Sequence, residues 1–261
     1  MITLTSVQLE AWIAAFIYPL SRILGLVASA PVVGSTGIPR RTRLMLGLAI
    51  TVALAPLLPP MPAVSPSSGA GLWIVAQQML IGVGMGFAMR IVFAAVEVAG
   101  EFIGLEMGLG FATFFDPTSS SQTPVVSELL NLLAILAFLA LNGPLLYVAT
   151  LAQSFEAIPV STTPLGAASW KNLAELGSLM FSAGLLLALP VLVALMIINL
   201  ALAVLTRAAP QLNVFAIGFP LTLGGGLIAL ATSLHYMAVP LQALFEQGMT
   251  AMLGFAQVPG R

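Results

Sequence analysis

Apolar residues occur along the chain in long runs, separated by short stretches rich in proline, glycine and polar residues. About 20 consecutive apolar residues cross the hydrocarbon core of a bilayer as a helix. The runs lack the alternation of polar and apolar positions that a lipid-facing strand requires. Because backbone groups in hydrocarbon must pair within each segment, the pattern predicts an all-α integral membrane protein. About six apolar helical segments are expected, at 11–33, 44–58, 72–96, 125–152, 177–205 and 214–245.

The first two runs differ from an ordinary spanning helix. No Lys or Arg precedes Arg22, so the basic region of a cleavable secretory signal is absent, and we expect a retained helix that is kinked at Pro19. The second run, 44–58, would extend only about 22 Å at about 1.5 Å per residue, against a slab of roughly 30 Å. We expect either a re-entrant hairpin or a helix whose neighbours are other protein chains.

Composition narrows the function. The chain has 261 residues, of which 59% are hydrophobic and 7% charged, and its mean hydropathy is +1.08. Eight basic and nine acidic residues form no basic patch, which excludes a soluble enzyme, a nucleic-acid partner and a disordered tail. There is no cysteine and His235 is the only histidine, so we expect no catalytic centre, no cofactor and no metal site.

Basic residues predict the orientation of the loops. Arg40, Arg41 and Arg43 follow the first segment, and Arg207 follows the fifth, with Pro210 and Gln211 next to it. Loops on the cytoplasmic side carry an excess of Lys and Arg. We therefore expect both loops to be cytoplasmic.

One helix face in the third segment combines charges with small residues. Arg90, Glu97 and Glu101 are seven and four residues apart and share a face. Gly100, Gly104 and Gly108 are interleaved with them and form a stripe that another helix can approach closely. Three interpretations remain open: an internal ion pair with packing inside the chain, contact between subunits, and a proton relay.

The segment after this face cannot be one continuous helix. Asp116 precedes Pro117 and is therefore disfavoured in a helical conformation, and Ser119 to Ser121 offer competing local hydrogen bonds. Phe111, Phe114 and Phe115 lie just upstream. These aromatic side chains either fill a core or close a pore as an apolar plug that excludes water.

At these residues the chain resembles the R subunit of the bacterial flagellar type III export gate, the FliR family, which is related to the SctT family of injectisomes. The resemblance covers nearly the whole chain. It is carried by Arg22, Gly25, Ile38-Pro39-Arg40, Arg43, Gly104 to Gly110, Phe111, Phe114 to Pro117, Asn142-Gly143, Leu189-Pro190, Asn199-Leu200, Arg207 to Gln211 and Gly218 to Thr222.

The resemblance implies a subunit of the flagellar protein export channel in the bacterial inner membrane, at the flagellar basal body. One R chain would join P and Q subunits (FliP and FliQ), as tilted antiparallel hairpins, around a closed pore that passes unfolded flagellar proteins. Residues 1–170 would resemble a P subunit and 171–261 a Q subunit. Residues 109–124 would form the pore plug, with Phe111, Phe114, Phe115, Asp116 and Pro117.

The resemblance also implies further partners. The loop at Arg207 would meet the specificity-switch subunit (FlhB), and the large gate subunit (FlhA) would belong to the same apparatus. The charged face at Arg90, Glu97 and Glu101 would then be satisfied between chains. We expect membrane lipid around the protein and no nucleic-acid partner.

Two other classes of protein are weighed against this one. A secondary transporter or ion-coupled carrier also uses helices broken at Gly and Pro, but it predicts an internal repeat, and the two halves show no convincing self-similarity. An intramembrane enzyme needs a nucleophile with a base within reach. Ser119 to Ser121 neighbour Asp116, but His235 is far away in sequence.

Overall fold

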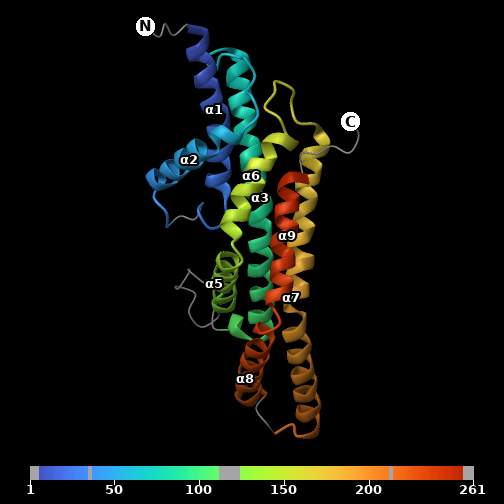
Figure 1. Ribbon diagram of the computed structural model, residues 1–261. Coiled ribbons are helices and arrows are strands. Elements are labelled where there is room, and N and C mark those ends of the chain that lie inside the picture. Colours follow the sequence, from blue (N-terminus) through green and yellow to red (C-terminus); the bar gives the residue numbers. More distant parts are fainter. Residues whose placement is uncertain (1–5, 35–36, 112–123, 212–213, 255–261) are drawn as a thin grey trace. The chain divides into compact units, whose positions relative to one another are not determined.

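The computed structural model describes residues 6–34, 37–111, 124–211 and 214–254, and every regular element in these ranges is a helix (Figure 1). This confirms the all-α prediction. The elements are α1 (Ser6–Ser29), α2 (Arg40–Leu54), the 3-10 turn η1 (Ala55–Leu57), α3 (Gly69–Glu106), the 3-10 turn η2 (Leu109–Phe111), α5 (Val125–Ala140), α6 (Gly143–Ala157), α7 (Ala167–Ala208), α8 (Val214–Leu234) and α9 (Ala238–Gly254).

Each of the six apolar runs is helical, but two of them contain a break. The run at 125–152 divides into α5 and α6 at Asn142, whose φ of 56° places it in the left-handed region. Asparagine tolerates that region better than most residues. The run at 214–245 divides into α8 and α9 between Leu234 and Ala238. The breaks fall at Asn142-Gly143-Pro144 and at His235-Tyr236, short stretches with long apolar sequence on both sides, which is why the search for long apolar runs did not divide them.

The apolar segments differ in whether they are long enough to cross a membrane. Four described helices are long and apolar enough, namely Gln8–Ser29, Gly69–Glu106, Ala167–Ala208 and Ile217–Leu234, and the count becomes five if α5 and α6 form one broken span. α2 has only 15 residues, about 22 Å of helix. The expectation of about six apolar segments therefore refers to segments and not to spans, and the four or five helices of sufficient length are consistent with an all-α membrane protein.

The chain forms two compact units, and each is described separately. The first contains the described residues of 6–91, 142–177 and 245–254, and the second contains those of 92–141 and 178–244. Helices α3, α7 and α9 each contribute residues to both units.

In the first unit, α1 and the first part of α3 pack with their backbones in contact. Gly82 lies against the backbone of Arg22, and Gly25 lies against the carbonyl of Met79, so a side chain at either glycine would force the helices apart. Next to this contact, Ala14, Tyr18 and Ile74 form a small buried core. The Tyr18 hydroxyl donates a hydrogen bond of 2.8 Å to the Val64 carbonyl.

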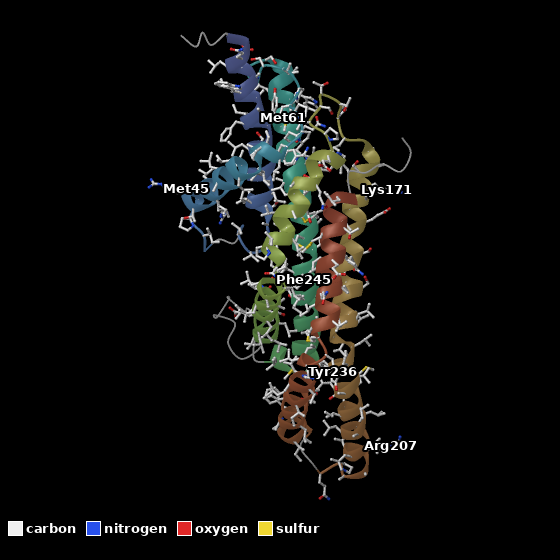
Figure 2. All side chains as sticks on the ribbon, in the orientation of Figure 1. Met45, Met61, Lys171, Arg207, Tyr236 and Phe245 are labelled. Atoms are coloured by element: carbon white, nitrogen blue, oxygen red, sulfur yellow. The ribbon has the colours of Figure 1, made fainter. Side chains whose placement is uncertain are left out.

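Helix α2 packs on α1 through a narrow stripe and leaves its remaining apolar surface uncovered. Its buried residues are Gly47, Thr51 and Leu54, and Gly47 faces the Leu24 side chain of α1. Met45, labelled on α2 in Figure 2, is 71% exposed. Such a surface fits an environment of lipid or of other subunits better than water.

In the second unit, the later part of α3 is surrounded by α5, α7 and α8. Phe93 of α3 meets Phe138 of α5 in an edge-to-face pair with ring centroids 5.8 Å apart. Gly184 of α7 lies against Ala95 and Val98 of α3. The second unit therefore holds the end of α3, where the predicted plug segment begins.

Candidate functional site

The predicted plug follows the end of α3. Phe111 is the last residue of η2, while its side chain and residues Phe114, Phe115, Asp116 and Pro117 lie outside the described part of the chain. The residues on both sides of this gap are described. They show how the chain leaves α3 and how it returns to the same helix.

Helix α3 ends at a glycine signal. Gly108 has a φ of 82°, a left-handed conformation that glycine adopts without steric cost and that commonly terminates helices. The amide of Met107 donates to the Ile103 carbonyl at 2.9 Å, and that of Gly108 donates to the Leu105 carbonyl at 3.0 Å. The last carbonyls of α3 are thus partly satisfied, and the chain turns away at a defined residue.

The chain comes back to α3 at the start of α5. The Ser127 hydroxyl donates to the Glu97 carbonyl at 2.9 Å, and Gly100 lies against the Ser127 backbone. A Cβ atom placed at Gly104 would be 3.9 Å from Val126 Cγ2 and 4.0 Å from Leu109 Cδ1. Residues before and after the gap therefore pack at the same turn of α3, so the predicted plug loop has its two ends side by side.

The residues predicted as a subunit interface separate into two groups. Gly100 and Gly104 are buried and face α5 of the same chain, whereas Gly108 ends the helix. Arg90, Glu97 and Glu101 are all exposed, and one Glu97 carboxylate oxygen accepts a hydrogen bond of 3.1 Å from Asn131 Nδ2. Packing against α5 of the same chain thus explains the small residues at Gly100 and Gly104. The role of the charged residues in an interface between subunits stays a prediction.

The basic residues assigned to loops occupy different positions. Arg40 and Arg41 form the exposed start of α2, and Arg43 is half-buried in the same turn. They lie in a helix and not in the loop before it, since Pro39 occupies the N-cap position and arginine is a good helix former. Arg207 lies in the last turn of α7 (Figure 2), followed by exposed Pro210 and Gln211.

A buried arginine is a site whose structural role the sequence did not show. Arg22 of α1 is 0% exposed. Its Nε donates to Gln78 Oε1 of α3 at 2.8 Å. Its Nη1 donates to the Ser154 carbonyl at 2.8 Å and to the Ser154 hydroxyl at 3.1 Å, and its Nη2 donates to the Ile158 carbonyl at 2.7 Å.

These bonds place the Arg22 guanidinium at the C-terminal end of α6. Carbonyls at this end lack partners within the helix, and the helix dipole favours a cation there. The guanidinium carbon also lies 4.1 Å from the centroid of the Phe155 ring, within the range of a cation–π contact. Arg22 thereby joins α1, α3 and α6, and a lone arginine inside an apolar run was the signal that pointed to it.

Long apolar helices, and a buried arginine whose donors are hydrogen-bonded within the chain, define a helical integral membrane protein. Residues 13–248 match the family described as bacterial export proteins, family 1. The chain belongs to this family, which confirms the resemblance to the FliR proteins.

Relatives of known name extend the match over almost the whole chain. Flagellar biosynthetic protein FliR of Pectobacterium carotovorum is 44% identical over 247 residues, covering 95% of this chain and 94% of the relative. The protein of the same name from Escherichia coli K12 is 42% identical with the same coverage. That from Bacillus subtilis 168 is 25% identical over 94% of this chain and 96% of the relative.

Proposed function

We propose that this protein is a structural, non-enzymatic subunit of the flagellar protein export channel in the bacterial inner membrane. It assembles with P and Q subunits (FliP and FliQ) around a closed pore that passes unfolded flagellar proteins. The observation that carries the proposal is the extended match to proteins named flagellar biosynthetic protein FliR within a family of export proteins.

Exposed apolar surface supports assembly with other chains. The most apolar window of α3 is 67% buried, but the corresponding window of α7 is only 22% buried. Leu186 and Leu200 of α7 are 67% and 68% exposed. One chain leaves this surface uncovered, and neighbouring subunits together with lipid would cover it.

The proposal assigns roles to the regions of the chain. Residues 1–170 act as the P-like part and 171–261 as the Q-like part. Arg90, Glu97 and Glu101 meet sister subunits, while the end of α7 around Arg207, Pro210 and Gln211 meets the specificity-switch subunit (FlhB) on the cytoplasmic side. The large gate subunit (FlhA) belongs to the same apparatus.

The segment 109–124 acts as the plug. Phenyl rings close a narrow constriction by excluding water and ions, without a charged ligand. The adjacent packing of Leu109 and Val126 at Gly104 supports this role, since a loop with its ends together can fill a constriction while its base stays in place. Phe111, Phe114 and Phe115 supply the rings.

The test replaces the three plug phenylalanines with alanine in the complex with P and Q. We expect the complex to assemble and the membrane to leak small solutes, measured as ion flux into vesicles. The matched control replaces three exposed phenylalanines, Phe87, Phe181 and Phe219, and should stay tight. A tight membrane together with an unstable protein would show that the plug phenylalanines fill a core.

A further inference from the structure

The last turn of α3 is fastened to α7 and α8. Asn199 Nδ2 of α7 donates a hydrogen bond of 2.8 Å to Glu106 Oε1, at the final residue of α3. On the other side, the Thr222 hydroxyl of α8 lies 3.4 Å from the Met107 carbonyl and 3.1 Å from the Gly218 carbonyl of its own helix. The Asn199–Glu106 bond is thus the shorter and more specific link.

Asn199 is a polar residue in a long apolar segment of α7. Apart from Asn199, all residues from Ala183 to Leu205 are apolar residues or glycine. An amide in such a segment is unfavourable in hydrocarbon unless it finds a hydrogen-bond partner within the protein. Glu106 provides that partner across 93 residues of sequence, which gives Asn199 a role in positioning α3 that an apolar residue could not fill.

Met107, the residue after Glu106, is held by packing. Its side chain is 0% exposed. Gly226 of α8 lies directly against it, so a Cβ atom at Gly226 would be only 2.5 Å from Met107 Cγ and 3.0 Å from Met107 Cε. The end of α3 is therefore held by one hydrogen bond from α7 and by close packing from α8.

This anchor lies immediately before the turn at Gly108 that leads out of α3. The Leu105 side chain, one residue earlier than Glu106, is exposed. Glu106 and Met107 are the residues of this turn with described contacts to α7 and α8. Glu106, which Asn199 holds, is bonded directly to Met107 in the chain. A shift of Glu106 after replacement of Asn199 therefore also shifts Met107 and the residues that follow it.

We propose that Asn199 is a positioning residue that holds Glu106, and with it the last turn of α3, so that the channel stays closed to small ions. This inference rests on the proposed function and adds that closure is controlled from α7 and α8. The partly buried hydrogen bond between Asn199 and Glu106 favours the closed state, and the loss of one hydrogen bond of typical strength shifts an equilibrium about fivefold.

The first test removes the bond by Asn199→Leu in the assembled complex with P and Q. We expect normal assembly and an ion leak raised about fivefold. Glu106→Leu should leak similarly. Glu106→Gln should remain tight, because the glutamine carbonyl oxygen still accepts from Asn199. Equal leakage of Glu106→Gln and Glu106→Leu would overturn the proposal. If Asn199→Leu fails to assemble, Asn199→Ala replaces it with a smaller change and the same expectation.

The second test restores the anchor with a covalent bond. The chain contains no cysteine, so Met107→Cys with Gly226→Cys introduces a single pair, at positions close enough for a disulfide. In the Asn199→Leu background, we expect oxidation to abolish the leak and reduction to restore it. A disulfide that forms but leaves the leak unchanged would contradict a positioning role.

The matched control joins α3 to a different helix, α7, away from the last turn of α3. Val98→Cys with Gly184→Cys forms this link, where a Cβ atom at Gly184 would be 3.1 Å from Val98 Cβ and 2.8 Å from the Ala95 carbonyl oxygen, so the oxidised and reduced forms of the same variant are compared. Oxidation of this pair should leave the leak of Asn199→Leu in place, since it does not hold the last turn of α3. A tight membrane with this pair would show general stiffening and overturn the specific role of the anchor.

The results separate this inference from the proposed function. If alanine at the plug phenylalanines causes a leak but Asn199→Leu does not, the proposed function stands and the role of Asn199 is wrong. If neither change causes a leak, the pore plug and its anchor are both wrong. If both leak and only the Met107–Gly226 disulfide reseals the membrane, both are supported.

Discussion

Arg22 shows how a single charged residue is accommodated in an apolar helix. The four hydrogen bonds described for its guanidinium go to uncharged oxygens on α3, on α6 and just after α6. Its planar fork of donors suits acceptors that lie in different directions, which a lysine ammonium on a flexible stem cannot match in the same geometry. Two of the four acceptors are backbone carbonyls, which have no sequence signature, so the sequence could not show how Arg22 is paired.

Arg22→Ala should destabilise the protein more than Arg41→Ala does. It removes the arginine donor from Gln78 Oε1 and the Ile158 carbonyl, while the Ser154 carbonyl keeps its bond of 2.9 Å from the Ile158 amide, and we expect a loss on the order of 3 kcal/mol. Arg22→Lys should lose less, because it retains one of the bonds. Thermal unfolding of the purified protein measures both, with the exposed Arg41→Ala as control. Equal melting temperatures of Arg22→Ala and Arg41→Ala would show that the hydrogen bonds of Arg22 make no net contribution to the stability of the protein.

At the scale of elements, the contact between α3 and α5 depends on one glycine of the predicted stripe. Gly100 touches the backbone of Ser127, whereas the nearest atoms to a Cβ at Gly104 are 3.9 Å away. The two positions look the same in the sequence, because both belong to a four-residue repeat of small residues. Only the crossing point of the helices distinguishes them.

This difference gives opposite expectations for two similar substitutions. Gly100→Ala should destabilise the protein by about 2 kcal/mol, since backbone atoms cannot move aside as a flexible side chain does. Gly104→Ala should be neutral or stabilising by up to roughly 1 kcal/mol, because alanine favours helix. Thermal unfolding of the two variants provides the comparison. Similar losses at both positions would mean that the α3–α5 crossing is not located at Gly100.

The helices themselves followed from the sequence more readily than their ends did. Every apolar run is helical, and the shortness of the second run correctly indicated a helix that does not span a membrane alone. The break at Asn142 was missed, because the short Asn142-Gly143-Pro144 stretch has long apolar sequence on both sides. The anchor of Glu106 was missed for a different reason: its partner, Asn199, is 93 residues away, and only folding brings them together.

For the whole molecule, the exposed apolar surface of α2 and α7 predicts dependence on partners. We expect the protein expressed alone to aggregate or to be degraded, and the protein expressed with P and Q subunits to purify in mild detergent as a large hetero-oligomer. Mass measurement of the purified particles tests this. A well-behaved monomer or dimer that carries a small metabolite across vesicles would instead support a transporter.

The bonds of Arg22 also constrain how the protein can be made. Gln78 follows Arg22 by 56 residues and Ser154 follows it by 132 residues, so both partners are synthesised after the first helix. Placing an unpaired arginine at the centre of a bilayer costs about 2.5–3.5 kcal/mol. The first helix therefore reaches its final environment only after more than half of the nascent chain has emerged, and until then the insertion machinery must shelter its charge.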